Sequence, residues 1–382
     1  MTNSVSSISI KQNQHILLTV SLPHADTVLY VDSLIPNHSY RLVTEQILSF
    51  GSIDSSESFV FTTLDTTSNN FTWQIDTLGD GANSTLKDVS IVNDSCIFAV
   101  GEIHIKDSTG NWDPNLYSVA KWNGAKWIYS VGAPVIINAV YAFSANDVWA
   151  GTTAPYHFNG IEWQGYNVTG LFNGYITKIW GTSSSNVYVV GTNGAIMHFD
   201  GTTWKQMESG TNVDLLDVWG SPDGSVVWAC GFKDCCPGTY LLRNTGTGWQ
   251  IAYDGTASQF TIKKDSLSGT FTNVFAPSNQ RLYVLTDAGL YTISKTTHGE
   301  ANLIPMMYGF PRGLRGNGSN DLFAVGEYYM IVHFNGSTVH YFSELEGSGR
   351  IVAVSQKNNS VFAVGYSFDP INSRGIVFRG KR

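Results

Sequence analysis

Two glutamates and a tyrosine occupy matching positions in three segments of this 382-residue chain. Glu102 and Glu327 each directly follow an Ala-Val-Gly sequence, and Tyr366 follows a third Ala-Val-Gly. Carboxylates beside aromatic rings suit carbohydrates, because the CH faces of a sugar stack on aromatic rings while its hydroxyls bond to acids. The nearby loop residues with the same chemistry are His104, Trp112, Asp113 and Tyr329. The alternative interpretation is that all seven are ordinary polar residues of surface loops.

The segments that must position these residues are copies of one repeat with a period of about 40 residues. The clearest copy, Tyr175–Ser209, is typical of four short strands joined by three turns. The first strands of the repeats are Leu86–Val89, Ile137–Val140, Ile176–Ile179, Leu215–Val218, Phe271–Val274, Arg312–Leu314 and Val352–Val354. The second strands end in Gly101, Gly151, Gly191, Gly231, Thr286, Gly326 and Gly365. This pattern predicts an all-β fold with a seven-bladed β-propeller over residues 71–382.

The third and fourth strands of a repeat meet at a turn of the form aromatic–Asn/Asp–Gly–x–x–Trp, as in Phe158–Trp163. We expect two-residue hairpins there, because Asn-Gly and Asp-Gly adopt positive φ readily. The last repeat stops after Gly380 without its Trp, whereas Phe71–Ile75 precedes the first repeat without partner strands. We therefore expect Trp73 to lie on the outer strand of blade seven, where this N-terminal strand closes the ring.

Loop lengths indicate which face of the ring carries a site. The loops between second and third strands share a face with the connections between blades, and lengths vary most on this face. The variable segments are Glu102–Asn115, Phe232–Gly238, Ala257–Ser268 and Tyr366–Ser373. Variable loops on a rigid scaffold are where binding residues concentrate. Because blades six, seven and one are neighbours in a closed ring, we expect Glu327, Tyr366 and Glu102 to lie on one part of this face.

Residues 1–65 differ from the repeats. Their β-prone runs are His15–Ser21, Thr27–Val31, Tyr40–Ser49 and Ser58–Thr63. Leu34, Pro36 and Tyr40 match the L-x-P-x-x-x-Y stretch of fibronectin type III domains, so the segment resembles the later half of such a domain. The resemblance implies a small β-sandwich module, shorter than usual, that serves as a spacer or tether. Residues 66–70 are a polar linker.

From Phe71 to Arg382 the chain resembles β-propellers of the sialidase and photosystem-assembly-factor type. It resembles more closely bacterial surface proteins that join a fibronectin-like module to such a ring. Hairpins such as Asp200–Trp204 are similar to the Asp-box of that group, Ser/Thr-x-Asp-x-Gly-x-Thr-Trp, but are one residue shorter. The resemblance implies the fold, whereas the activities in the group range from enzymes to scaffolds.

Glycoside hydrolysis, as in a sialidase or glycosidase, is the alternative to non-catalytic binding. Two carboxylates could act as acid and nucleophile, or Tyr366 with a glutamate could resemble the nucleophile pair of a sialidase. A sialidase also holds its substrate with three arginines, for which the candidates are Arg312, Arg315, Arg350 and Arg374. The sialidase motif F/Y-R-I-P is absent, since the FPRG sequence at Phe310–Gly313 does not match it. We therefore favour non-catalytic recognition.

Other polar residues have structural interpretations. One column along the first strands reads Asp88, Ala139, Lys178, Asp217, Asn273, Gly313 and Ala353, and we expect its polar members to be hydrated in a central channel. His157, His198 and His333 share one repeat position and thus lie on different blades, so they cannot hold one metal ion. In an exported protein Cys230 would form a disulfide with Cys235 or Cys236. Free thiols are the alternative, and Cys96 is too far round the ring to complete a zinc site.

Composition narrows the class of function. The net charge is −8 and no Lys/Arg-rich run occurs, which argues against a nucleic-acid partner. No apolar run reaches the roughly 18 residues that a membrane span needs. A signal peptide is not evident at the N-terminus, yet the Asn/Ser/Thr-rich, Lys-poor composition is typical of exported proteins. We therefore expect a piece of an extracellular or cell-surface protein, monomeric and without a cofactor, that binds a glycan or a partner protein.

Overall fold

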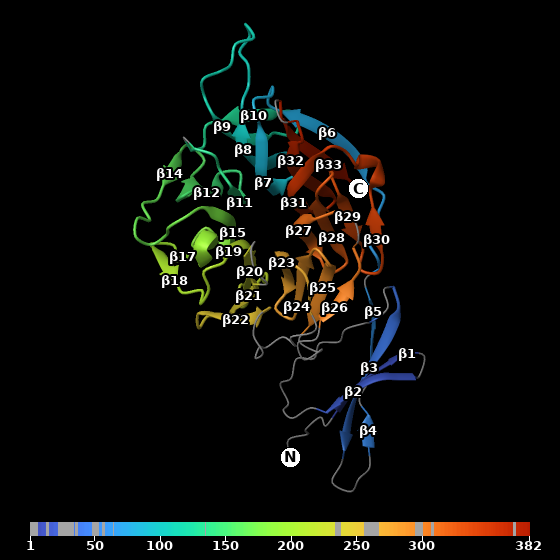
Figure 1. Ribbon diagram of the computed structural model, residues 1–382. Helices are drawn as coiled ribbons and strands as arrows, with labels where there is room; N and C mark the ends of the chain where they lie inside the picture. Colours follow the sequence, from blue (N-terminus) through green and yellow to red (C-terminus); the bar gives the residue numbers. More distant parts are fainter. Residues whose placement is uncertain are drawn as a thin grey trace. The chain divides into compact units, whose positions relative to one another are not determined.

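The computed structural model describes residues 7–12, 15–21, 34, 37–47, 53–55, 58–63, 65–133, 135–233, 238–255, 267–294, 301–306, 309–369 and 372–382. The chain divides into two compact units, Met1–Thr67 and Ser68–Arg382 (Figure 1). Within the described ranges, regular structure is antiparallel strand except for the 3-10 turns η1 (Thr192–Gly194) and η4 (Ser343–Leu345). No helix among these residues is long and apolar enough to span a lipid bilayer. The predicted all-β class is confirmed.

The N-terminal unit contains five strands, β1 (Ser7–Gln12), β2 (His15–Ser21), β3 (Ser39–Ile47), β4 (Ile53–Ser55) and β5 (Phe59–Thr62). They form one connected sheet in the order β2-β1-β3-β4, and β5 pairs with the first residues of β3. Tyr40 is buried, and its ring centroid stacks 5.9 Å from that of Phe61. The predicted strand Thr27–Val31 lies outside the described residues, so a second layer of the sandwich stays a prediction.

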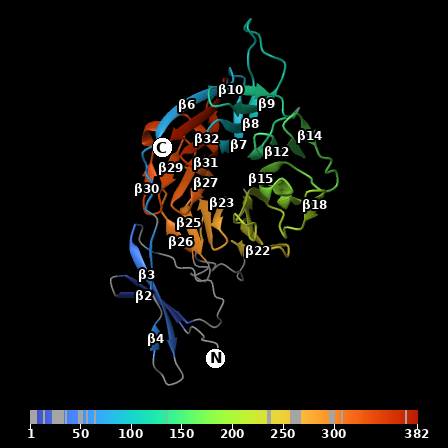
Figure 2. The same cartoon turned by 180° about the vertical axis from the view of Figure 1, so that it is seen from behind.

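The second unit contains seven four-stranded antiparallel sheets arranged as blades around an axis (Figures 1 and 2). This confirms the predicted seven-bladed propeller. The first six blades are β7 (Thr85–Asn93), β8 (Cys96–Ile103), β9 (Tyr117–Trp122), β10 (Trp127–Ser130); β11 (Ala139–Ser144), β12 (Asp147–Gly151), β13 (Pro155–Phe158), β14 (Trp163–Gly165); β15 (Ile176–Ser183), β16 (Asn186–Gly191), β17 (Ile196–Phe199), β18 (Trp204–Met207); β19 (Asp214–Gly220), β20 (Val227–Lys233), β21 (Gly238–Asn244), β22 (Trp249–Asp254); β23 (Phe271–Ser278), β24 (Arg281–Thr286), β25 (Gly289–Ser294), β26 (Ala301–Ile304); and β27 (Pro311–Gly318), β28 (Asp321–Gly326), β29 (Ile331–Phe334), β30 (Val339–Tyr341).

The seventh blade combines the two ends of this unit. It contains β31 (Gly349–Lys357), β32 (Ser360–Ser367), β33 (Gly375–Lys381) and, on its outer edge, β6 (Thr72–Leu78). Trp73 pairs with Gly380, and its ring packs 5.1 Å from Phe342 of the neighbouring blade. Without β6 the edge of β33 would be exposed, so β6 closes the ring as predicted.

Packing between blades explains the sequence of the second strands. First strands of successive blades contact one another around the axis, including β31 and β7. Each sheet is covered on both faces by its neighbours, so a second strand such as β8 is buried along most of its length and reads as a continuous apolar run rather than an alternating one. Trp149 of blade two, for example, packs in one cluster with Ile179 and Phe199 of blade three.

The hairpins at the outer edge differ from the prediction. A four-residue loop, Asn123–Lys126, separates β9 from β10, in place of a two-residue turn. Only Gly124 in this loop has a positive φ, of 94°. Asn123 instead accepts hydrogen bonds on its side-chain oxygen from the N–H groups of Ala125 and Lys126. The same side-chain bonds recur at Asn159, Asp200 and Asn335. The Asn or Asp at this position therefore stabilises the turn through its side-chain oxygen.

Candidate functional site

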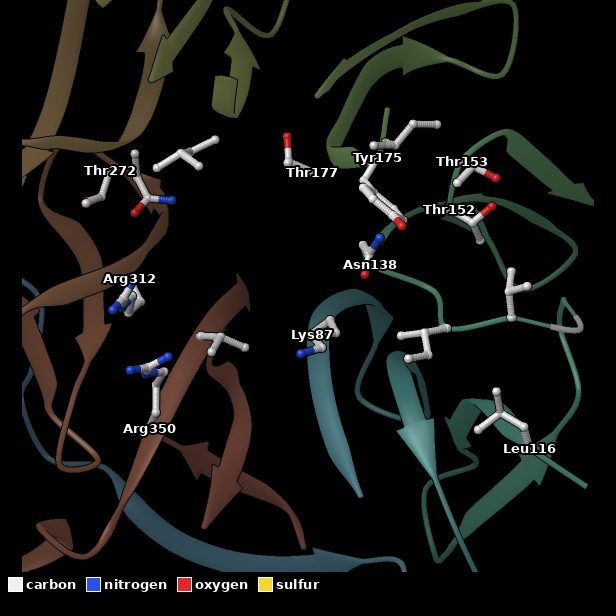
Figure 3. A pocket seen from close by; sticks show the side chains of 16 residues that line it. Lys87, Leu116, Asn138, Thr152, Thr153, Tyr175, Thr177, Thr272, Arg312 and Arg350 are labelled. Atoms are coloured by element: carbon white, nitrogen blue, oxygen red, sulfur yellow. The ribbon is translucent and has the colours of Figure 1, made fainter. Parts of the chain in front are cut away.

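A pocket of about 880 Å³ lies on the axis of the ring, at the end where the first strands begin. This is the face that also carries the blade connections and the loops between second and third strands, where the sequence places a site. Every blade contributes to its wall. The contributing residues, in blade order, are Lys87, Asn138, Thr177, Leu216, Thr272, Arg312 and Arg350 (Figure 3).

In six blades a β-bulge in the first strand directs one residue at the pocket. In β7, Leu86 pairs with Gly101 and Asp88 with Val100, so Lys87 between them has no partner in the ladder. A bulge leaves its extra residue unpaired and re-aims the side chain. The same shift occurs in β15, β19, β23, β27 and β31. The residues skipped there are Thr177, Leu216, Thr272, Arg312 and Val352, and all of them line the pocket.

The glycines that end the second strands permit this bulge. A Cβ on Gly101 would lie 2.1 Å from the carbonyl oxygen of Thr85, and one on Gly365 would lie 1.8 Å from that of Arg350. Non-bonded carbon and oxygen atoms cannot approach so closely, so in these two blades the bulged strand requires a residue without a side chain opposite it. Blade five has the same bulge with Thr286 at this position. The repeated glycine of the sequence is thus part of the geometry that forms the pocket.

One wall of the pocket is cationic. The Nε and Nη2 atoms of Arg312 lie 3.0 and 2.9 Å from Oε1 of Glu327, and Nε of Arg350 lies 2.8 Å from the same oxygen. Nη1 of Arg350 also donates to the hydroxyl of Tyr366, at 3.0 Å. One carboxylate therefore orients two guanidinium groups. Lys87 is the third basic side chain of this wall, and all three point into the cavity (Figure 3).

The protonation of these groups follows from their surroundings. Burial lowers the pKa of Lys87; the charge of Glu102 opposes this decrease, and that of Arg350 adds to it. For Arg350 burial also acts to lower the pKa, but the hydrogen bond to Glu327 and the nearby phenol of Tyr366 outweigh it and raise the pKa overall. Arg350 therefore stays charged at any physiological pH.

The opposite wall is apolar with scattered hydroxyls. Leu116, Val135, Ile136 and Tyr175 line it, and Tyr175 is 60% exposed. Thr152 and Thr177 add hydroxyl groups, and Asn138 adds an amide (Figure 3). Exposed apolar side chains at the mouth of a pocket are a common feature of binding sites. The pocket therefore suits an occupant with an anionic group on one side and apolar groups on the other.

The polar residues expected in a central channel make ion pairs and hydrogen bonds to one another, and their hydration stays a prediction. Asp88 is buried, and its Oδ1 lies 2.6 Å from Nζ of Lys178, two blades away. Asp217 is fully buried and binds Arg315, again two blades away, at 2.6 and 2.9 Å. Asn273 donates to Asp217 at 3.2 Å. Asp88 and Asp217 thus have charged partners on other blades, as buried charges require, and Arg315 is thereby unavailable to a ligand.

The predicted site residues divide into two groups. Glu327 and Tyr366 bind the arginines of the pocket. The charge of Glu102 acts to raise the pKa of Lys87, and the carboxylate of Glu102 lies 2.9 Å from Nε2 of His104. The other predicted residues are elsewhere. Trp112 is exposed beside Lys106, Asp113 binds Tyr117, and Tyr329 packs against Phe378 in the core.

Sequence reasoning missed Lys87, Asn138 and Tyr175. The repeat could have revealed the first two, because Lys87 and Asn138 occupy the same repeat position as Thr177 and Arg312. This position lies one residue before the column that contains Asp88. Arg312 and Arg350 were named only as candidate arginines of a sialidase. Arg374, the fourth candidate, is exposed and does not line the pocket.

A Ser-His-Asp group in blades two and three does not have the geometry of a catalytic triad. Nε2 of His157 lies 2.8 Å from Asp147 and 3.3 Å from Oγ of Ser184, so acid and hydroxyl share one ring nitrogen. A triad needs the carboxylate on the other nitrogen. Ser184 also accepts a hydrogen bond from the indole N–H of Trp149. The group therefore links the blades.

The other two histidines of this repeat position have equivalent partners. His198 lies 2.7 Å from Asn186 and stacks on Tyr188, and His333 lies 2.9 Å from Asp321 and stacks on Phe323. Each histidine thus joins the second and third strands of its own blade.

The two cysteines within the described ranges, Cys96 and Cys230, do not line the pocket. Cys230 has a free thiol in the core between blades four and five, where burial raises its pKa well above the usual value. It packs there because its strand is covered on both faces. The predicted disulfide partners, Cys235 and Cys236, lie outside the described residues. Cys96 is also a free, buried thiol.

Comparison with known proteins gives similarities of sequence and of structure. No family model matches the chain. A curated protein, Immune protein Tsi7 of Pseudomonas aeruginosa, is 40% identical over 73 residues, which are 19% of this chain and 22% of that protein. The chain therefore matches only about a fifth of the length of this relative.

Two solved structures share the architecture. "YCF48 bound to D1 peptide" superposes with a TM-score of 0.60 at 14% identity, over 81% of this chain and 97% of that chain. "YCF48 from Cyanidioschyzon merolae" gives a TM-score of 0.53 at 11% identity, over 80% and 98% of the two chains. At such low identities the likeness shows the fold alone. The second unit thus shares the β-propeller fold of these two structures.

Proposed function

We propose that this chain is a non-catalytic binding protein that takes a carboxylate-bearing segment of a partner protein into the axial pocket. The observation that carries the proposal is the pair of arginines oriented by Glu327. Among the described residues no hydrogen bond occupies Nη1 of Arg312 or Nη2 of Arg350, so both retain N–H groups for a ligand. Guanidinium groups bind carboxylates strongly and with defined geometry.

The remaining pocket walls favour a peptide over a sugar. Leu116, Val135 and Ile136 would cover apolar side chains, while Asn138 and Thr177 would bond to peptide groups. A sugar would need several polar partners in place of this aliphatic surface. One structural neighbour is a propeller bound to a peptide of D1, which supports the same class of ligand. Glycan binding is the alternative that the binding experiment below distinguishes from peptide binding.

The experiment measures binding of a peptide library with free C-terminal carboxylates, and of the same library with C-terminal amides, to the full chain. Replacing Arg312 and Arg350 together by Gln should weaken binding of the acids by at least tenfold, since a hydrogen bond to a charged group contributes about 1.5–3 kcal/mol. Arg374→Gln is the matched control, because Arg374 is an exposed arginine that is not among the lining residues of the pocket. Equal binding by the double variant would contradict the proposal. Glycan-array binding that is lost in the double variant would favour a carbohydrate instead.

We also propose that the chain acts outside the cell or at its surface, with the N-terminal unit as a fibronectin-like tether. The low charge, the polar composition and the match of Leu34, Pro36 and Tyr40 to fibronectin domains support this proposal. Protease treatment of intact cells that express the natural protein tests it. Resistance of the protein in intact cells, combined with cleavage after lysis, would contradict surface exposure.

A further inference from the structure

An exposed group of aromatic residues lies directly beside the arginines. Tyr328 is 59% exposed and Phe368 is 40% exposed, with ring centroids 6.3 Å apart at 88°. The ring of Tyr366 lies 6.3 Å from that of Phe368. The guanidinium carbon of Arg350 is 5.8 Å from the ring centres of both Tyr366 and Phe368. One basic side chain thus contacts the aromatic group and lines the axial pocket.

A second hollow lies beside the axial pocket at the aromatic group. It has a volume of about 460 Å³ and is lined by Tyr366, Phe368 and Ser373 of blade seven and by Asn83 and Thr85 at the start of blade one. Lys87 lines both hollows. The second hollow is therefore adjacent to the axial pocket, on the side of blades seven and one.

The turn that presents Tyr328 is conformationally strained. It joins β28 to β29, with the N–H of Met330 bonded to the carbonyl of Glu327 at 3.0 Å. Tyr328 and Tyr329 both have φ of 58°, in the left-handed region that favours Gly and Asn and disfavours bulky residues. Strain of this kind persists where the surroundings enforce it, and it is concentrated at functional sites.

Packing accounts for Tyr329 but not for Tyr328. The ring of Tyr329 lies 5.2 Å from Phe378 and against Gly349, where an added Cβ would lie 2.0 Å from a ring carbon. Tyr329 thus anchors the turn in the core. Tyr328 is mostly exposed, and its described ring contact is with Phe368. Burial in the free protein therefore does not explain a tyrosine in this unfavourable conformation.

We propose that Tyr328, Tyr366 and Phe368 form an aromatic subsite for the C-terminal residue of the partner segment, and that this residue is aromatic. The inference rests on the proposed function, because it assigns the carboxylate of the same residue to Arg312 and Arg350. An edge-to-face arrangement is a preferred geometry for aromatic rings, and the hollow of about 460 Å³ beside Tyr366 and Phe368 offers space for a third ring. Arg350 contacts both the anion site and the rings, so a single terminal residue fills both.

Three labelled pentapeptides test the subsite by fluorescence polarisation with the full chain. They are Ala-Ala-Ala-Ala-Phe as the free acid, the same peptide as the C-terminal amide, and penta-alanine as the free acid. The Phe acid should bind about tenfold more tightly than penta-alanine, given the affinity that an aromatic pair adds. The Phe amide should bind at least tenfold more weakly than the Phe acid.

Two variants separate this role from a structural one. Tyr328→Gly relieves the strain at φ 58°, so its unfolding temperature should rise while its preference for the Phe acid over penta-alanine is lost. Phe368→Ala should lose the same preference. Ile161→Ala is the control, since Ile161 is 89% exposed in an outer hairpin at the other end of the blade and should leave binding unchanged.

The outcomes distinguish this inference from the proposed function. If the two acids bind equally and the amide binds weakly, the aromatic subsite is refuted while carboxylate recognition stands. If acid and amide bind equally, carboxylate recognition fails, and the subsite fails with it. Absence of binding by all three peptides would refute both. A decrease in the unfolding temperature of Tyr328→Gly would refute the argument from strain.

Discussion

The buried ion pair between Asp217 and Arg315 offers the sharpest test of how the ring is held together. Asp217 is fully buried and Arg315 is 5% exposed, and two hydrogen bonds of 2.6 and 2.9 Å join them. Oδ2 of Asp217 also accepts bonds from Asn273 and from the backbone N–H of Val274. Blades four, five and six thus meet at one carboxylate. Asp217→Asn keeps the shape of the side chain but removes its charge.

The expected cost follows from what the substitution leaves behind. The guanidinium of Arg315 would remain buried, stacked 4.2 Å from Trp219, without its counter-charge. Removing one partner of a buried pair costs about 3–5 kcal/mol. At roughly 2 °C per kcal/mol for a unit of this size, the unfolding temperature should decrease by about 6–10 °C.

Thermal unfolding followed by circular dichroism measures this change. The control is Lys205→Met, because the pair of Lys205 with Asp200 lies 2.5 Å apart but has a 66% exposed lysine. Exposed pairs contribute about 0–1 kcal/mol, so the control should change the unfolding temperature little. The double variant Asp217→Leu/Arg315→Met should recover most of the lost stability, since no unpaired charge remains. A loss of under about 1 kcal/mol in Asp217→Asn would refute the reasoning.

Three further predictions concern other parts of the ring. Burial of Asp321 acts to raise its pKa, but hydrogen bonds from His333 and Arg382 outweigh this effect and lower the pKa overall. The pKa of Asp321 is lower in the folded than in the unfolded protein, so its contribution to stability is present above about pH 4 and is lost as pH falls. In Asp321→Asn, the free energy of unfolding measured with urea should therefore decrease less steeply as pH is lowered. Trp73→Ala should destabilise the ring by about 3 kcal/mol and expose β6 to proteolysis, because β6 loses its packing against blade six. An unchanged rate of proteolysis would contradict a closing role for β6. Gly365→Ala places a Cβ 1.8 Å from the carbonyl oxygen of Arg350, so it should displace that arginine and reduce binding of carboxylate peptides by at least tenfold, as isothermal calorimetry would measure.

The repeat made the architecture predictable, whereas the site depended on features that a linear pattern does not contain. Local spacing of strands, turns and terminal glycines was enough for seven blades and for closure through Trp73. The position of the pocket-lining residues depended on a bulge, and a shift of one residue along a strand changes which face a side chain occupies. A linear pattern therefore did not reveal that the neighbouring column, with Lys87 and Arg312, lines the pocket.

Long-range pairing was the second obstacle to prediction. Arg315 and Asp217 are 98 residues apart in the sequence, and Lys178 and Asp88 are 90 apart. Partners at such distances are determined by the order of blades around the ring and by the depth of each residue along its strand. Neither quantity is visible in composition or in a local motif. Asp88, Lys178 and Asp217, which were expected to face water in a channel, are therefore paired inside the protein.

The bulges described above also have a consequence for how such a ring can acquire new specificity. A bulged residue takes no part in the strand ladder, so exchanging its side chain leaves the hydrogen bonds of the blade in place. Six blades of this chain hold such a residue at the same depth, and these six range from Leu and Val through Thr to Lys and Arg. Each lining position can therefore vary separately from the others while the frame of strands stays constant. Evolution or a protein engineer can change the recognised ligand by point substitution without altering the fold.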